Sequence, residues 1–285
     1  MDFTERKFAT ADGPVIHLRD YPAPERSLLP VICLHGLTRN ASDFDTVAAR
    51  ICALGRRVIV PDARGRGNSD NDPDPSRYRP DVYVGDLFGA MDLLGLERAV
   101  FVGTSMGGIM TMLAASRAPS RVAGAVLNDI GPVIDPSGVK RIASYVGRSG
   151  PFADWQEAVE AIRASQSSCY PGRDDLFWQT FARRVARERG GRVEFAYDPA
   201  IAAAFAAPPA RPAPDLLSCF AALAHGPVLV IRGETSDILA REGVEIMRRA
   251  KPDLEFAEVP ATGHAPTLEE AEAWRAISAF LSKVE

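Results

Sequence analysis

A serine between two glycines has the residue types that nucleophilic catalysis needs. Ser105 stands between Gly103 and Gly107, after an apolar run that predicts a buried strand and before apolar residues at helical spacing. We therefore expect Ser105 on a tight strand-to-helix turn, where glycines allow backbones to approach closely. The backbone N–H of Met106, at the start of the helix, would stabilise a developing negative charge. The alternative interpretation is a structural serine that caps this helix.

Serine is a weak nucleophile at neutral pH, so catalysis requires an imidazole to take its proton and a carboxylate to orient the imidazole. His264, Asp237 and Asp129 each follow a predicted strand of the same chain. The carboxyl ends of parallel strands meet at one edge of a sheet, so these side chains are expected near Ser105. The residues alone leave both aspartates open as the partner of His264.

A second group of residues is suited to stabilising an oxyanion. His35, Gly36 and Leu37 follow the predicted strand 31–34. A glycine loop at this edge would let the backbone N–H of Leu37 point toward Ser105. We expect the His35 ring to support the loop rather than to act on substrate.

Apolar strand patterns alternate with helical patterns along most of the chain, which is typical of an α/β fold with a mostly parallel sheet. Eight strands are predicted, over residues 3–10, 15–21, 31–34, 57–61, 100–103, 122–128, 228–231 and 254–259. The main helices are predicted over 43–54, 80–94, from 106, up to 250 and from near 267.

The texture changes between residues 132 and 224, where aromatic residues and helical patterns replace the valine-rich strands. We expect 1–131 and 225–285 to form the core domain and 132–224 an inserted helical cap. Such a cap would cover Ser105 with apolar side chains, although most of its aromatic residues would serve its own core.

Composition excludes several other classes of protein. The chain has 285 residues, 46% of them hydrophobic, and a net charge of -4, which argues against nucleic-acid binding. Neither a signal peptide nor a membrane span is evident, so we expect a cytoplasmic monomer or homodimer. The four cysteines are scattered along the chain and predict buried free thiols rather than a zinc site or disulfides; they are Cys33, Cys52, Cys169 and Cys219. We expect neither a metal nor another cofactor.

Taken together, these motifs resemble the α/β-hydrolase family over nearly the whole chain. The resemblance rests on His35-Gly36, the loop 62–69, the turn 103–107, the segment 232–237 and Gly263-His264. The resemblance implies that Ser105 is the nucleophile, His264 the general base and Asp237 the orienting acid. It also implies that the backbone amides of Leu37 and Met106 are the oxyanion donors. The Gly-x-x-Ser-Asp setting of Asp237 is the one the family usually uses, and Asp129 is the alternative acid.

The function that this resemblance implies is hydrolysis of small or medium apolar carboxylic esters through an acyl-enzyme. A lactone or a carbon–carbon bond of a β-diketone would suit the same residues. Serine at position 105 argues against the dehalogenases and epoxide hydrolases of this fold, whereas a cofactor-free haloperoxidase fits the motifs. A ligand-binding receptor that keeps the fold is the alternative from another class, because fold alone does not determine function.

Overall fold

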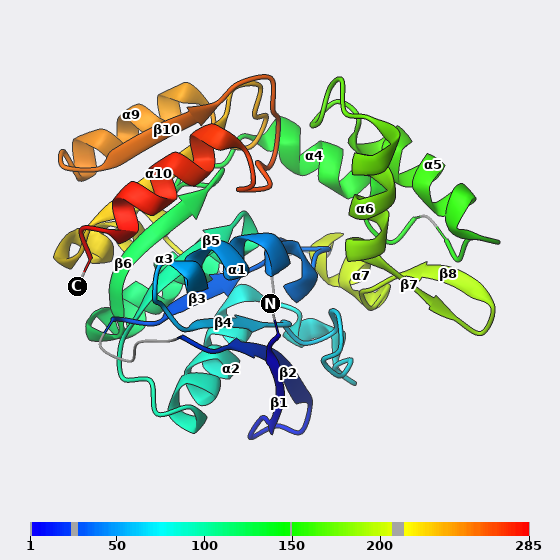
Figure 1. Ribbon diagram of the computed structural model, residues 1–285, viewed down its shortest axis with the longest axis horizontal. Coiled ribbons are helices and arrows are strands. Elements are labelled where there is room, and N and C mark those ends of the chain that lie inside the picture. The colour runs from blue at the N-terminus through cyan, green and yellow to red at the C-terminus, as the bar shows by residue number, and fades with distance from the viewer. Residues whose placement is uncertain (1, 24–27, 149, 207–213, 285) are drawn as a thin grey trace.

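A twisted sheet of eight strands runs through the protein (Figure 1). The computed structural model describes residues 2–23, 28–148, 150–206 and 214–284. The strand order is β1-β2-β4-β3-β5-β6-β9-β10; β1, β2 and β4 pair antiparallel, and all other neighbours pair parallel. The strands are β1 Thr4–Ala9, β2 Val15–Tyr21, β3 Val31–Leu34, β4 Val58–Pro61, β5 Ala99–Thr104, β6 Val122–Asn128, β9 Val228–Gly233 and β10 Glu255–Val259. The predicted mostly parallel, eight-stranded sheet is confirmed.

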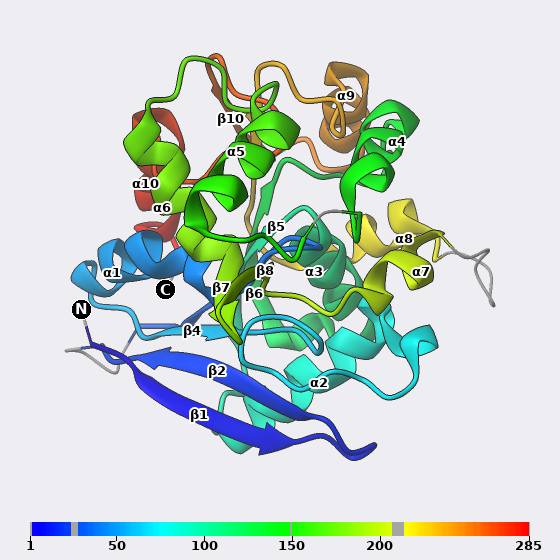
Figure 2. The same cartoon turned by 90° about the vertical axis from the view of Figure 1, so that its right-hand side faces the viewer.

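Helices cover both faces of the sheet, so the central strands are buried on each side and read as continuous apolar runs (Figure 2). One apolar cluster joins the sheet to α1 (Asp45–Ala53) and α10 (Ala271–Leu281). The other joins it to α2 (Pro80–Leu93), α3 (Met106–Arg117) and α9 (Arg241–Ala250). This arrangement leaves the carboxyl edge of the sheet as the place where loops meet.

The last helix starts later than the sequence pattern suggests. The predicted helix start near Thr267 is wrong, because Leu268 has a φ of 67°, outside the helical region. The backbone N–H and the hydroxyl of Thr267 both donate to the Glu270 carboxylate instead, at 3.0 and 2.9 Å. The helical turn therefore begins only at Ala271.

Residues 132–224, here called the insertion segment, connect β6 to β9 and gather beyond one end of the sheet (Figures 1 and 2). Besides helices, the segment contains a β-hairpin, which the sequence analysis did not predict. The hairpin forms because Gly190 and Gly191 adopt φ values of 60° and 74° and close a tight turn. Its last helix packs against α3 of the core. Its elements are α4 Pro136–Tyr145, α5 Trp155–Gln166, α6 Asp175–Val185, β7 Ala186–Arg189, β8 Arg192–Phe195, α7 Ala200–Ala206 and α8 Leu216–Ala221.

Four aromatic rings form a separate core within the insertion segment. Tyr170, Phe177, Trp178 and Phe181 contact one another with centroid distances of 5.1 to 6.2 Å. All four cysteines are buried free thiols, as predicted. In the described part of the chain, no helix combines the length and apolar composition of a membrane span.

Candidate active site

Ser105 lies on the predicted strand-to-helix turn between β5 and α3, in a backbone conformation that residues other than glycine rarely adopt. Its φ is 52° and its ψ is -114°. The turn is possible only with small neighbours: a Cβ on Gly103 would lie 2.4 Å from the carbonyl of Gly107. A Cβ on Gly107 would lie 2.0 Å from the backbone oxygen of Leu34. The glycines therefore allow α3 to approach the sheet and project Ser105 beyond the strand end.

A chain of hydrogen bonds joins Ser105 to a histidine and a carboxylate. The Ser105 hydroxyl lies 2.8 Å from Nε2 of His264, and Nδ1 of His264 lies 2.8 Å from Oδ2 of Asp129. With Nδ1–H donating to the carboxylate, Nε2 is left as the acceptor for the serine proton. The arrangement has the parts and the order of a nucleophile, a base and an orienting acid.

Asp129 is fixed by donors from the neighbouring strand end. Its Oδ1 accepts from the backbone N–H of Gly233 at 2.8 Å, and its Oδ2 accepts from the hydroxyl of Ser236 at 2.6 Å. The backbone N–H of Leu239 in turn donates to the Ser236 hydroxyl at 3.1 Å. Asp129 is fully buried, and these bonds compensate for the water that its carboxylate has lost.

The preference for Asp237 as the partner of His264 is corrected by this geometry. Asp237 binds Arg141 of α4 instead, with Nε and Nη2 at 2.5 and 2.8 Å from its two oxygens. Burial raises the pKa of the Asp237 carboxyl, whereas the hydrogen bond and the charge of Arg141 lower it. The net shift of this pKa is downward. Asp237 therefore links the core to the insertion segment, while Asp129, the alternative acid, faces the imidazole.

The loop that carries His264 is held partly by the insertion segment. The backbone N–H of Gly263 donates to the carbonyl of Cys169 at 2.7 Å. On the other side of His264, the Tyr170 hydroxyl donates to the carbonyl of Ala265, also at 2.7 Å. The position of the imidazole thus depends on contacts that the residue pattern of the core does not reveal.

The loop after β3 has the support that a backbone oxyanion donor requires. Nδ1 of His35 lies 2.7 Å from the carbonyl oxygen of Gly36, and its Nε2 accepts from the backbone N–H of Ala63 at 3.0 Å. Because a trans peptide directs its C=O and N–H oppositely, the Leu37 N–H points away from the His35 ring. Burial lowers the pKa of His35, which favours the neutral ring that this bonding requires. The supporting role expected for His35 agrees with these contacts.

Arg66 is a buried residue that contacts both predicted oxyanion donors, and the sequence analysis did not single it out. Its Nε donates to the backbone oxygen of Leu37 at 3.0 Å, and its Nη2 lies 3.7 Å from the sulfur of Met106. Its Nη1 also donates to the hydroxyl of Tyr83 at 2.7 Å. The only signal for this role was its place in the loop 62–69, beside the predicted site.

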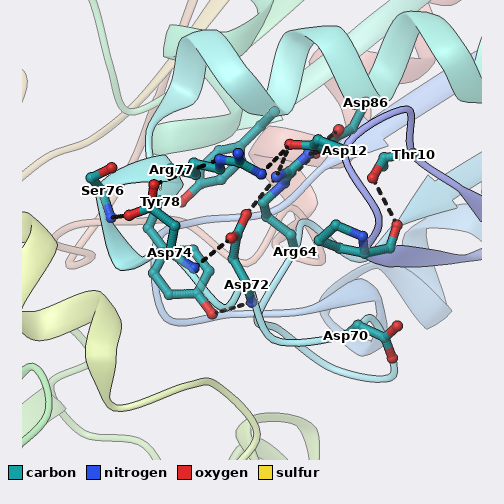
Figure 3. Close-up of polar contacts among 12 residues, drawn as sticks. Thr10, Asp12, Arg64, Asp70, Asp72, Asp74, Ser76, Arg77, Tyr78 and Asp86 are labelled. Atoms are coloured by element: carbon teal, nitrogen blue, oxygen red, sulfur yellow. Dashed lines mark hydrogen bonds and ion pairs between the residues drawn. The ribbon is translucent and has the colours of Figure 1, made fainter.

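Arg64 anchors that same loop in a cluster of carboxylates (Figure 3). Its guanidinium lies 2.5 Å from Asp72, 2.5 Å from Asp86 and 2.9 Å from Asp12. Arg64 is 1% exposed, so these ion pairs compensate for the buried charge. Arg64 and its three aspartate partners thus hold this loop in place.

Ser105 opens onto a pocket between the carboxyl edge of the sheet and the insertion segment. Its apolar wall comes mainly from the insertion segment. Arg39 and Asp43, from the chain after β3, add a polar part to the lining. The apolar lining residues include Ile142, Ile162, Phe181, Val185 and Phe195.

Comparisons with known proteins agree with this fold. The family model for the alpha/beta hydrolase fold matches residues 30–271. A 3-hydroxybutyrate-oligomer hydrolase from Cupriavidus necator is 38% identical over 253 residues, which cover 86% of this chain and 85% of that protein.

A 2-(acetamidomethylene)succinate hydrolase from Mesorhizobium japonicum is 28% identical, over 82% of this chain and 81% of that protein. The crystal structure of an alpha/beta hydrolase from Novosphingobium aromaticivorans superposes with a TM-score of 0.92 and 43% identity, and covers 99% of each chain. These relatives support a hydrolase. The chain belongs to the alpha/beta hydrolase fold family.

Proposed function

We propose that the protein is a serine hydrolase that cleaves small or medium carboxylic esters through an acyl-enzyme. The observation that carries this proposal is the continuous path from Ser105 through His264 to Asp129, at 2.8 Å for each step. The first relative described above is named for hydrolysis of 3-hydroxybutyrate oligomers, whose units are joined by ester bonds. That name supports an ester substrate for the present chain.

In the first half of the reaction, Nε2 of His264 takes the proton of Ser105 as the hydroxyl oxygen attacks the ester carbonyl. The imidazolium is stabilised by Asp129. The negative charge on the former carbonyl oxygen is accepted by the N–H groups of Leu37 and Met106. His264 then protonates the departing alcohol, and the acyl group remains on Ser105.

In the second half, a water molecule replaces the alcohol. His264 takes a proton from the water as it attacks the acyl carbon, and the same two amides bind the oxyanion. Collapse of this intermediate returns the proton to Ser105 and releases the carboxylic acid. No cofactor takes part in these steps.

In this proposal the insertion segment, residues 132–224, acts as a cap over the pocket that contains Ser105. Its apolar side chains at the pocket, such as Phe181 and Val185, favour an apolar acyl or alcohol group and exclude bulk water. Its hydrogen bonds to the loop of His264 also help to hold the base in position.

The test is hydrolysis of p-nitrophenyl esters from acetate to decanoate by the wild type and by Ser105→Ala. We expect turnover that peaks at short or medium chains, and a fall on the order of 10⁴-fold or more in the variant. Equal activity of the two proteins would refute the serine mechanism. If both are inactive on esters but the wild type cleaves lactones or β-diketones, the nucleophile stands and the substrate class changes. Ligand binding by both proteins without any turnover would support the receptor alternative.

A further inference from the structure

The pocket lining includes an arginine–aspartate pair beside the oxyanion loop, which the proposed acyl transfer does not use. Nε of Arg39 lies 2.7 Å from Oδ2 of Asp43, and both residues line the pocket with Ser105. Their side chains are 19% and 11% exposed. A solvated surface pair would gain little from such a location, because its charges would be better hydrated outside the pocket.

The position of Arg39 relative to Ser105 is defined by the glycine between them. A Cβ on Gly36 would lie 3.4 Å from Cγ of Arg39 and 3.9 Å from Cβ of Ser105. The guanidinium carbon of Arg39 also lies 4.1 Å from the ring centroid of Phe181, on α6 of the insertion segment. The charged group therefore lies over an aromatic ring in the lining of the same pocket.

The pair offers unused hydrogen-bonding capacity. Oδ1 of Asp43 is buried and accepts no hydrogen bond from any residue that the structure describes. The guanidinium of Arg39 presents several N–H donors in a fixed plane. Its Nε is also buried and donates no hydrogen bond to a residue that the structure describes, although Asp43 lies within ion-pair distance. An acceptor and a donor thus lie side by side and match a group that both donates and accepts.

We propose that Arg39 and Asp43 bind a hydroxyl group on the acyl chain, and that the preferred substrates are hydroxyacyl esters. The hydroxyl donates to Oδ1 of Asp43 and accepts from the Arg39 guanidinium. A free carboxylate fits less well, because it has no proton to donate and would meet the negative charge of Asp43. This inference rests on the proposed function, since it names the substrates of the same site.

The test compares three methyl esters of similar size: methyl butyrate, methyl 3-hydroxybutyrate and monomethyl succinate. Acid release is followed by titration at constant pH. We expect kcat/KM of the wild type to be about ten- to hundredfold higher for the hydroxy ester than for methyl butyrate, because a hydrogen bond to a charged group is at stake. Equal values for these two esters, or a preference for monomethyl succinate, would overturn the proposal.

The variant Asp43→Asn separates recognition from a structural effect. With its amide oxygen facing Arg39, the new side chain presents an NH₂ group at the position where Oδ1 accepts the hydrogen bond of the substrate hydroxyl. We expect the ratio of kcat/KM between hydroxy ester and plain ester to fall about tenfold or more. A purely structural role would lower both values together and leave the ratio unchanged, which would count against us. Asp175→Asn is the matched control, because Asp175 is 80% exposed and binds Arg163 on the surface.

A binding measurement on Ser105→Ala keeps the inference testable even where hydrolysis fails. Calorimetric titration with methyl 3-hydroxybutyrate and methyl butyrate should give a Kd at least tenfold lower for the hydroxy ester. Absence of turnover in the wild type together with this preference would refute the proposed function but not the hydroxyl site. Equal binding would refute the site alone.

Discussion

Substitution of Asp129 by asparagine tests the assignment of the acid most sharply. The wild-type carboxylate accepts hydrogen bonds from three donors: Gly233, Ser236 and His264. The amide has only one oxygen. If its NH₂ group faces His264, the imidazole must turn to the tautomer with its proton on Nε2, and it can no longer accept the proton of Ser105.

The other orientation of the new amide in Asp129→Asn would be no better. Its NH₂ group would then face the backbone N–H of Gly233 across the 2.8 Å now spanned by a hydrogen bond. One orientation of the amide therefore imposes the wrong tautomer on His264, and the other places two hydrogen-bond donors against each other. From the effect of the same substitution in serine triads, we expect kcat to fall on the order of 10⁴-fold, equivalent to about 5.5 kcal/mol.

The matched control is Asp237→Asn, which removes the partner of Arg141. The two side chains of this pair are 32% and 21% exposed, so its loss should cost about 1 kcal/mol or less. We expect kcat within about fivefold of the wild type, measured with the best p-nitrophenyl ester of the series. A large loss in Asp237→Asn with a small loss in Asp129→Asn would refute the reasoning.

Three other predictions concern the elements that support the site. Arg64→Met leaves the buried Asp72 carboxylate without its cation and should lower the free energy of unfolding by about 3–5 kcal/mol in urea titrations; a change below about 1 kcal/mol would contradict this. Gly107→Ala should prevent folding or greatly reduce the yield of soluble protein. Its control is Gly85→Ala, where an added Cβ meets no atom within 4 Å and should stabilise α2 by about 0.5–1 kcal/mol. Similar melting temperatures for the two variants would show that the close approach at Gly107 is not required. His35 has a lowered pKa, so the folded state binds fewer protons than the unfolded state and its stability should decrease as the pH falls below the unfolded value of 6.5 toward the folded pKa. His35→Gln should remove this part of the pH dependence in thermal unfolding between pH 8 and 5, and an unchanged slope would argue against a neutral buried ring.

The sheet and the nucleophile could be predicted from sequence because each depends on short segments. The runs Val31–Leu34 and Val122–Asn128 are apolar throughout, apart from the terminal asparagine, and the structure reproduces both bounds. The turn at Ser105 follows from its own glycines. The hairpin of the insertion segment was missed because its strands carry charged residues, although Gly190 and Gly191 are a turn signal.

The choice between Asp129 and Asp237 could not be made from local sequence. Both follow strands at the same edge, and the decision depends on which partners reach them in space. Arg141, 96 residues away along the chain from Asp237, occupies that carboxylate, while Ser236 and Gly233 orient Asp129. Arg66 was missed for the same reason, since its contact with Met106 joins the loop 62–69 to the first residue of α3.

The measurement that tests the central claim most directly is covalent labelling of the nucleophile. A fluorophosphonate reacts with a serine activated by its histidine, and intact-protein and peptide mass spectrometry locates the adduct. We predict one adduct, on Ser105, with labelling abolished in Ser105→Ala and strongly slowed in His264→Ala and Asp129→Asn. Labelling at another residue, or at an equal rate in His264→Ala, would contradict the account.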